Sequence, residues 1–419
     1  MKLEVITVGT ELLLGATIDT NAADLGRALA AAGVEVVRRA TVPDRAGAVQ
    51  DAVREALART GAVLATGGLG PTRDDLTKKA VAELFGRPLQ LDSGVLRSLE
   101  QRFRRLGRPM PAVNRTQAEV PEGAVVLPNP RGTAPGLWIE DQQGRFAILL
   151  PGVPSEMRGL LVEEVLPRLV QRQAATGEGE PPVVRSRTVR TTGVPESAVA
   201  ERVEPLEDGL QPLTLAYLPG LAGVDLRLTA WAMPRSRADA LLADGVARLR
   251  TELGERCYGE ENDDLAGVVL ASLRDRKATL AVAESCTGGM LGSRITAVQG
   301  SSDVFSGGII AYSDAVKTEQ LGVPGDTLAA HGAVSEETVL AMAEGVQRRF
   351  DATCTIAITG IAGPDGGTPE KPVGTVWLAA RAASAARAVR RVFPGDREEI
   401  RGRSAQAALD LLRLLIREH

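Results

Sequence analysis

A serine and a cysteine lie at a predicted sharp turn in the last third of the 419-residue chain. Residues 278–282 are apolar and predict a buried strand, and residues 290–295 have the apolar spacing of a helix. Between them, Ser285 and Cys286 precede a Thr-Gly-Gly sequence whose glycines let a ligand or another backbone come close. The N–H groups of the helix start would favour an oxyanion or a phosphate. The stretch is therefore a candidate nucleophile turn, with helix capping by Ser285 or Thr287 as the structural alternative.

Two later segments, 306–317 and 359–367, also run from an apolar strand pattern into a polar or glycine-rich loop, where open parallel sheets place their sites. A hydroxyl nucleophile needs a base, and of the two histidines only His331 is internal, with no motif that links it to Ser285. Lys317, if buried, could lose its charge and accept the serine proton, with Tyr312 relaying or orienting that proton. The alternatives are a solvated helix lysine and a core aromatic residue.

These segments together closely resemble the C-terminal domain of the CinA (competence/damage-inducible) family, over about residues 258–419. That domain is similar to the nicotinamide-nucleotide amidases, which convert nicotinamide mononucleotide to nicotinate mononucleotide and ammonia without a cofactor. The resemblance implies Ser285 as nucleophile, with Lys317 and Tyr312 as its activating pair. It also implies a substrate cleft with phosphate contacts from the last helix, formed by Thr287, Gly288, Gly289, Gly308, Thr359, Gly360, Arg397 and Arg401.

The first region alternates strand and helix patterns, which predicts βαβ units and a parallel sheet. Its third strand, 62–65, leads into a glycine-rich turn over residues 66–77 that fits neither the dinucleotide nor the P-loop fingerprint. Backbone N–H groups freed by glycines can bind an anion, and Asp74 or Asp75 can hold a divalent cation beside it. The alternative is a helix start with acidic residues in its first turn.

Residues 1–170 look like the molybdopterin-binding fold as it occurs in the CinA family, on the motifs at 8–22, 66–75, 128–136 and 150–157. Within that family this domain is associated with a metal-dependent pyrophosphatase that acts on ADP-ribose. The resemblance implies phosphate contacts from Gly67, Gly68, Gly70 and Thr72. It implies a divalent metal such as Mg²⁺ or Mn²⁺, and leaves room for a monovalent cation. The candidate ligands and water-activating groups are Glu11, Asp44, Asp74, Asp75 and Glu156.

A polar segment with glycine and proline, 171–182, predicts a linker, and residues 183–254 read as a small βαββα unit with a KH-like outline. Its Gly-Leu-Ala-Gly sequence, 220–223, lies between two predicted strands, where a hairpin turn explains it better than an RNA-binding loop. We therefore expect a spacer or a dimerisation domain. The whole chain is predicted to be an α/β protein: a three-layer parallel-sheet domain, this small domain and an α/β amidase domain at 258–419.

Composition narrows the function classes. The net charge of −4 argues against a general nucleic-acid binder, and no apolar run is long enough to cross a bilayer. Three widely separated cysteines favour reduced thiols in the cytoplasm. We expect a homodimer that acts on small nucleotides. Two functions remain: a bifunctional enzyme that recycles pyridine nucleotides, or a competence or damage-response protein that binds without catalysis.

Overall fold

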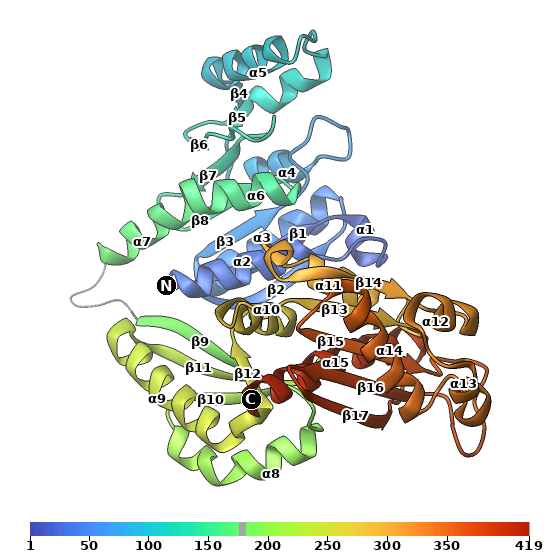
Figure 1. Cartoon of the computed structure of the whole chain (residues 1–419). Coiled ribbons are helices and arrows are strands. Elements are labelled where there is room, and N and C mark those ends of the chain that lie inside the picture. Colours follow the sequence, from blue (N-terminus) through green and yellow to red (C-terminus); the bar gives the residue numbers. More distant parts are fainter. Residues whose placement is uncertain (176–181, 419) are drawn as a thin grey trace. The chain divides into compact units, whose positions relative to one another are not determined.

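The computed structural model describes residues 1–175 and 182–418 (Figure 1). They separate into two compact units. The first is Met1–Arg185 with Ala230–Ala240, and the second is Ser186–Thr229 with Leu241–His419. Each unit contains its own clusters of buried apolar side chains.

A six-stranded sheet forms the centre of the N-terminal domain, in the order β2-β1-β3-β8-β7-β6. Its strands are β1 (Lys2–Val8), β2 (Glu35–Val42), β3 (Ala62–Thr66), β6 (Val125–Leu127), β7 (Gly136–Glu140) and β8 (Phe146–Leu150). Strands β2, β1, β3 and β8 are parallel, whereas β7 and β6 are antiparallel. The predicted parallel sheet therefore has an antiparallel edge, because a short turn at 141–144 joins β7 to β8 in place of a crossover helix.

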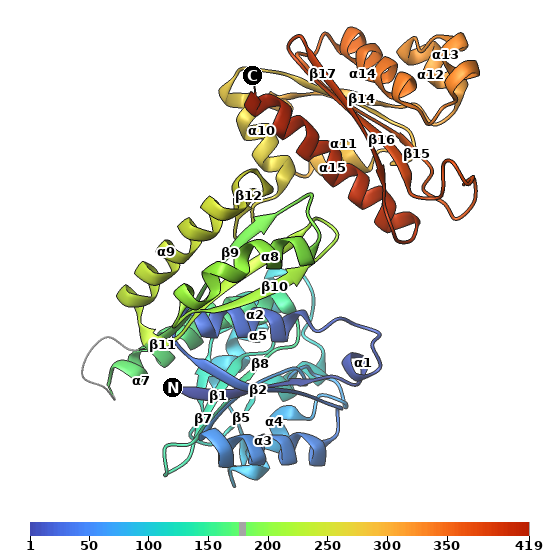
Figure 2. The same ribbon diagram turned by 90° about the horizontal axis from the view of Figure 1, so that it is seen from below.

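Helices cover both faces of this sheet, because its inner strands β1, β3 and β8 are buried on both sides. Leu3 and Val5 of β1 pack with Leu25 of α2, while Ile6 of the same strand packs with Val53 of α3. Figure 2 shows α2 on one side of the strands and α3 and α4 on the other, which confirms the predicted three layers. The remaining elements are α1 (Thr10–Leu13), α2 (Thr20–Ala31), α3 (Ala46–Thr60), α4 (Thr77–Leu84), β4 (Leu89–Leu91), α5 (Ser93–Arg105), β5 (Glu119–Pro121), α6 (Pro154–Leu160) and α7 (Leu166–Ala174).

The predicted linker, 171–182, starts too early. Helix α7 continues to Ala174, because Leu169 and Gln173 are buried on one face of it and the Gln173 amide donates to the carbonyl of Gly33. Strand β9 then begins at Pro182. Residues 176–181 of the predicted linker lie outside the described residues.

A five-stranded sheet forms the C-terminal domain, in the order β14-β13-β15-β16-β17. The first three strands of this order are parallel and the last two are antiparallel. Helices α10, α11 and α15 share one apolar cluster with the sheet, and α12 and α14 share the other (Figure 2). The elements are α10 (Leu265–Asp275), β13 (Leu280–Glu284), α11 (Met290–Thr296), β14 (Phe305–Ile310), α12 (Asp314–Leu321), α13 (Gly325–His331), α14 (Glu336–Phe350), β15 (Cys354–Gly360), β16 (Thr375–Ala382), β17 (Ala385–Val392) and α15 (Arg397–Glu418).

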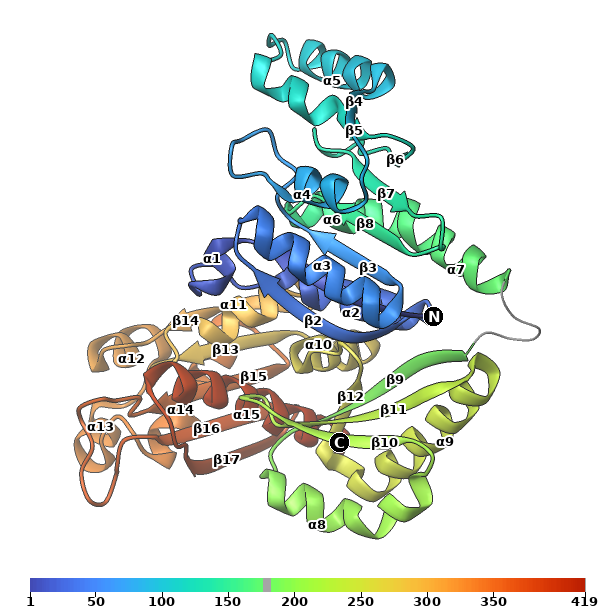
Figure 3. The same ribbon diagram turned by 180° about the vertical axis from the view of Figure 1, so that it is seen from behind.

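The middle domain has the predicted βαββα order. Its elements are β9 (Pro182–Thr191), α8 (Glu196–Glu207), β10 (Thr214–Pro219), β11 (Val224–Pro234) and α9 (Arg235–Leu253). Figure 3 shows β9, β11 and β10 side by side. The Gly-Leu-Ala-Gly sequence is the predicted hairpin turn, closed by a hydrogen bond from Gly220 N to Gly223 O. Gly223 is required there, because a Cβ on it would lie 2.0 Å from the carbonyl oxygen of Thr191.

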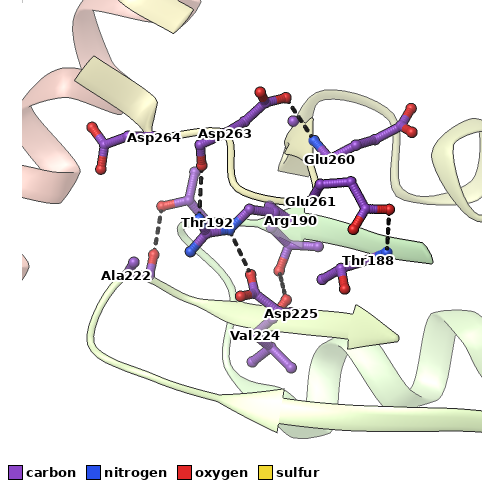
Figure 4. Close-up of polar contacts among 12 residues, drawn as sticks. Thr188, Arg190, Thr192, Ala222, Val224, Asp225, Glu260, Glu261, Asp263 and Asp264 are labelled. Carbon is purple, nitrogen blue, oxygen red and sulfur yellow. Dashed lines mark hydrogen bonds and ion pairs between the residues drawn. The ribbon is translucent and has the colours of Figure 1, made fainter. Parts of the chain in front are cut away.

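A fourth strand, β12 (Cys257–Glu260), extends this sheet beside β9 and leads into the C-terminal domain. Polar contacts hold the junction together (Figure 4). Arg190 on β9 donates to the Asp225 carboxylate at 3.3 Å and to the Asp263 carbonyl at 2.7 Å. The Asp263 carboxylate in turn accepts from Glu260 N. The C-terminal domain therefore starts from a strand that belongs to the middle domain's sheet.

Candidate functional site

Ser285 is the first residue after β13, the strand between β14 and β15. Its N–H donates to Ile358 of β15 at 2.9 Å, and the preceding carbonyl, of Glu284, accepts from Ala311 N at 2.7 Å. Ser285 thus lies between the carboxyl ends of two parallel neighbours, as predicted for a site in an open sheet. Its hydroxyl makes no hydrogen bond to any described residue.

The turn after Ser285 depends on two glycines in the left-handed region, Gly288 (φ +56°) and Gly289 (φ +94°). Gly289 is the N-cap residue of α11, so the N-cap position itself has no side chain that could cap the helix. The capping alternative for Ser285 and Thr287 is therefore wrong. The Thr287 hydroxyl is fully buried and has no partner among the described residues.

The N–H groups at the start of α11 are already bound to a side chain. The buried carboxylate of Glu284 accepts from Gly289 N and Leu291 N at 3.1 Å each and from Gly292 N at 2.8 Å. The expectation that these groups would attract a substrate anion or an oxyanion is wrong, because Glu284 occupies that position. Sequence reasoning missed Glu284, although an acid that ends an apolar strand just before a helix is a usable signal.

Lys317 is 1% exposed, so the condition of burial is met and the alternative of a solvated helix lysine is wrong. Its Nζ donates to the carbonyl of Tyr312 and to Asp314 Oδ1, both at 3.3 Å. Asp314 was not singled out in the sequence, yet its position three residues before Lys317 puts the two side chains on one helix face. The amine is thereby held at the turn between β14 and α12.

Tyr312 follows β14 and is 59% exposed, so it is not a core aromatic residue. Its hydroxyl accepts from Arg397 Nη2 at 2.8 Å, and only its carbonyl contacts Lys317. Among the described contacts, the Tyr312 hydroxyl therefore interacts with an arginine and not with Ser285 or Lys317.

Two arginines of α15, both predicted as site residues, form hydrogen bonds to the loops of the site. Arg397 Nη1 donates to the carbonyl of Gly363 at 2.6 Å, and Arg401 donates to the carbonyl of Thr287 at 2.6 and 3.2 Å. With the bond to Tyr312, these contacts join the loops after β13, β14 and β15. Each guanidinium keeps N–H groups beyond those used here, since arginine carries five.

Other predicted site residues have structural contacts. Thr359 is buried at the end of β15, and its hydroxyl donates to the carbonyl of Ala333 at 2.7 Å. Gly360 ends β15, where a Cβ would lie 2.7 Å from Val376 Cγ2. Gly308 lies inside β14 opposite Val282, and a Cβ there would be 2.6 Å from Val282 Cγ2. Strand packing explains Gly308, which is not in the loops around Ser285.

The alternative nucleophile at this turn is Cys286, and the alternative base is His331. Cys286 is buried, and desolvation raises the pKa of its thiol to about 12, so the reactive thiolate is scarce at neutral pH. His331 is half-exposed, and its Nδ1 lies 3.4 Å from the Glu337 carboxylate.

In the N-terminal domain, the glycine-rich turn after β3 is arranged around Asp75. Its carboxylate accepts from Gly70 N at 2.7 Å and Thr72 N at 2.8 Å, and from the Thr72 hydroxyl. Gly67 (φ +108°) needs to be glycine, because a Cβ would lie 2.2 Å from the carbonyl oxygen of Val8. Gly68 (φ +65°) packs equally closely on Thr77. The N–H groups of Gly70 and Thr72 that were expected to bind phosphate are thus bound to Asp75.

The five carboxylates predicted as metal ligands do not form a preformed cage. Within residues 1–175 and 182–418, no three Asp, Glu, His or Cys side chains come together in a metal-binding group. Asp44 accepts from Thr10 N at 2.8 Å, Glu156 accepts from the Asn129 amide at 2.7 Å, and Asp75 binds its own turn. Glu11 and Asp74 are exposed. This set does not fit an all-protein metal site. It fits only an ion that keeps its waters and shares one or two carboxylates with substrate phosphates, as Mg²⁺ does.

A small cavity of about 130 Å³ lies at the carboxyl ends of β1 and β3, and Glu11, Asn21 and Thr66 line it. The Asn21 amide nitrogen donates to the carbonyl of Gly152 at 2.7 Å, whereas its Oδ1 is buried without a partner among the described residues. Sequence reasoning quoted Asn21 within a motif but did not select it as a site residue.

The fold and these turns define a multidomain α/β protein whose first domain is molybdopterin-binding-like. Residues 4–171 match the family model "Probable molybdopterin binding domain", residues 186–259 match "Damage-inducible protein CinA KH domain", and residues 262–416 match "CinA C-terminal domain". A CinA-like protein of Gemmatimonas aurantiaca is 56% identical over 99% of this chain and 96% of its own length. The chain therefore belongs to the CinA family.

One further relative spans nearly the whole chain, and a solved structure matches part of it. A CinA-like protein of Gloeobacter violaceus is 45% identical over 98% of this chain and 95% of its own. The crystal structure of the competence/damage inducible protein CihA from Agrobacterium tumefaciens is 39% identical, covering 36% of this chain and 93% of that one, with a TM-score of 0.35. Among the described residues, no helix is both long and apolar enough to cross a membrane.

Proposed function

We propose that the C-terminal domain is an amidase that hydrolyses nicotinamide mononucleotide to nicotinate mononucleotide and ammonia, with Ser285 as the nucleophile. The observation that carries this proposal is the turn at Ser285: a hydroxyl with no hydrogen-bond partner among the described residues, at the carboxyl end of β13. Beside it, the N–H groups of Cys286 and Thr287 make no backbone hydrogen bond within the described residues. Two such donors next to a nucleophile are what a developing oxyanion requires.

The reaction would proceed in two stages. Ser285 Oγ forms a bond to the amide carbon while its proton passes to a base, and the C–N bond then breaks as ammonia leaves with that proton. Water hydrolyses the resulting ester and releases the acid. Lys317 is the proposed base, because it is the buried amine of the same sheet edge. Arg397 and Arg401 are the proposed phosphate contacts. They would bind the phosphate through N–H groups that are not hydrogen-bonded to the loop carbonyls or to Tyr312.

The test is ammonia release from nicotinamide mononucleotide by the full chain. Ser285→Ala should abolish it, whereas Cys286→Ala should keep most of it, since the Cys286 thiol with its pKa near 12 is almost wholly protonated. Inactivation by iodoacetamide together with an inactive Cys286→Ala variant would overturn the serine assignment. A wild-type chain that releases no ammonia would overturn the amidase proposal itself.

A second proposal concerns the N-terminal domain, which we infer to hydrolyse ADP-ribose to AMP and ribose 5-phosphate. It is favoured by the cavity at the ends of β1 and β3, where Asn21 Oδ1 is buried without a partner among the described residues. Such an acceptor is suited to a hydroxyl or N–H of a ligand. Glu11 and Asp74 are the exposed carboxylates that could share a divalent ion with the substrate phosphates. When bound, such an ion neutralises pyrophosphate charge.

This activity should vanish with EDTA, return with Mg²⁺ or Mn²⁺, and fall in Asp74→Asn and Asn21→Leu, while ammonia release stays intact. Hydrolysis that survives both chelation and Asp74→Asn would place the reaction elsewhere. Binding of ADP-ribose without hydrolysis would favour the rival function, a competence or damage-response protein with a non-catalytic pocket. We also propose a homodimer, which light scattering on the purified chain tests directly.

A further inference from the structure

A second cavity, of about 550 Å³, lies where the middle domain meets the C-terminal domain inside the second unit. We call it the junction cavity. Three segments form it: the β10–β11 hairpin with the start of the α8 connection, the end of β17, and α15. Its volume is in the range of cavities that hold small molecules. None of the residues assigned above to the amidase or pyrophosphatase sites lines it.

The sequence pattern shows that regular secondary structure forms the wall of the cavity. Along β17 alternate residues line the cavity, Val389 and Arg391, and the lining continues with Phe393 and Pro394 just after the strand. Val389 and Arg391 therefore lie on one face of the strand. From α15 the lining residues recur at helical spacing: Arg403, Gln406, Ala407, Asp410, Leu411 and Leu414. A strand face and a helix face, each partly apolar, therefore meet the hairpin without filling the space between them.

Gln406 supplies a polar atom that has no partner. The residue is 3% exposed, and its Nε2 donates to the Thr192 hydroxyl at 3.0 Å. That hydroxyl donates its one proton to the carbonyl of Ala222 at 3.0 Å (Figure 4), so it can only accept from Gln406. The amide orientation is thereby fixed, and Oε1 is left buried without a partner among the described residues. A buried acceptor of this kind needs a donor.

Positive charge also faces the cavity. Arg256, Arg391 and Arg403 line it, and none of them forms an ion pair with a described acidic residue. Arg403 Nε is a second buried group without a partner in the described chain. Of the two lining acids, Asp410 is paired with Arg413 at 2.7 Å, which leaves Glu196. The cavity therefore has more cationic than anionic groups available to a ligand.

From these features we propose that the junction cavity binds a nucleoside monophosphate. The base donates an N–H to Gln406 Oε1, and the phosphate lies against the arginine side chains. Phe393 and Leu411 provide an apolar wall for the flat ring. This site is separate from those proposed for catalysis, and it would exist whether or not the chain is an amidase.

The probe is AMP added to the full chain, with hydrogen–deuterium exchange as the readout. AMP should protect peptides that cover the hairpin at 219–224 and α15 at 403–414, and adenosine or inorganic phosphate alone should protect them less. Protection confined to residues 1–170, or produced by a single-stranded RNA oligomer and not by AMP, would overturn the proposal.

Matched variants then test the contacts. Gln406→Leu removes the acceptor at nearly constant volume, and Arg391→Ala removes an exposed guanidinium. Each should weaken AMP binding about 10-fold or more, which is the effect of losing one good polar contact. Arg390→Ala is the control, because Arg390 points to the opposite strand face and donates to the carbonyl of Glu370. If Gln406→Leu fails to fold, the proposal is decided by comparing the AMP affinities of Arg391→Ala and Arg390→Ala. Equal affinity in those two variants would refute the site.

AMP titrations of the Ser285→Ala variant distinguish this proposal from the amidase proposal. That variant should retain protection of 403–414, because Ser285 does not line the junction cavity. Loss of ammonia release with intact protection would therefore support both proposals, whereas loss of protection in this variant would contradict a junction cavity that is separate from Ser285.

Discussion

Two turns in this protein leave the carboxyl end of a parallel strand, pass through glycines with positive φ and enter a helix. One follows β3 and the other follows β13. In each, a single acidic side chain accepts several backbone N–H groups. In the N-terminal turn the acid comes after the glycines, and Asp75 binds the turn itself. In the C-terminal turn it comes before them, and Glu284 binds the helix start.

The position of the acid decides which groups stay available. Glu284 occupies the start of α11 and leaves the Ser285 hydroxyl without a hydrogen bond, and the next two N–H groups without a backbone acceptor, within the described residues. Asp75 instead uses the N–H groups that phosphate would have needed. The same plan of strand, glycine turn and helix therefore leaves a hydroxyl group available in one domain and produces a turn bound to its own acid in the other.

The largest predicted effect concerns ammonia release and Lys317, the proposed base beside the C-terminal turn. Lys317→Arg places a guanidinium group there that is always protonated and cannot accept a proton at neutral pH, so ammonia release should fall by roughly 10²-fold or more. Lys317→Met, which is closer in volume, should be equally inactive while the unfolding midpoint stays near that of the wild type. The control is Lys277→Arg, at an exposed lysine. Near-normal turnover in Lys317→Arg would show that another group or water takes the serine proton.

The next prediction concerns the buried acid of the C-terminal turn. Glu284→Gln replaces a charged acceptor of three N–H groups by an amide whose NH₂ faces donors. We expect a loss of about 2–3 kcal/mol in the free energy of unfolding, since a buried charge-assisted network is broken. Urea unfolding measures it, with the exposed Glu319→Gln as the control. A loss below about 0.5 kcal/mol, typical of surface changes, would show that Glu284 does not organise the turn.

The corresponding change in the N-terminal turn should be milder. Asp75→Asn also loses charge, but Thr72 is exposed, so water can replace the missing contacts. We expect a loss of about 1 kcal/mol in the free energy of unfolding. Amide exchange at Gly70 and Thr72 should accelerate, while exchange in α11 stays unchanged. A loss as large as that of Glu284→Gln would remove the distinction between the two turns.

The sequence predicted the three-domain order, the layers and a sharp strand-to-helix turn at Ser285. Those depend on local periodicity and on motifs at strand ends, which a sequence carries directly. It did not predict the partners of the acids. Whether Asp75 binds a metal or its own turn, and whether Glu284 or a ligand meets α11, depends on how a side chain a few residues away folds back. Gln406 was missed for a related reason, because its partner Thr192 is 214 residues away in the chain.

The smallest predicted effect is a pH dependence near the N-terminal turn. Burial lowers the pKa of Lys78, three residues after Asp75, from 10.5 to about 8. Below pH 8 both the folded and the unfolded chain carry the proton, and folding then includes the full penalty of burying the ammonium group. Between pH 8 and 10.5 the folded state has lost the proton that the unfolded state still binds, so stability rises with pH. Because the side chain keeps some contact with water, the gain should be only about 1 kcal/mol, and it should disappear in Lys78→Met but not in the exposed Lys79→Met. Urea unfolding at pH 7.5 and pH 10 measures it, and a wild-type stability that falls relative to Lys78→Met over this range would contradict it.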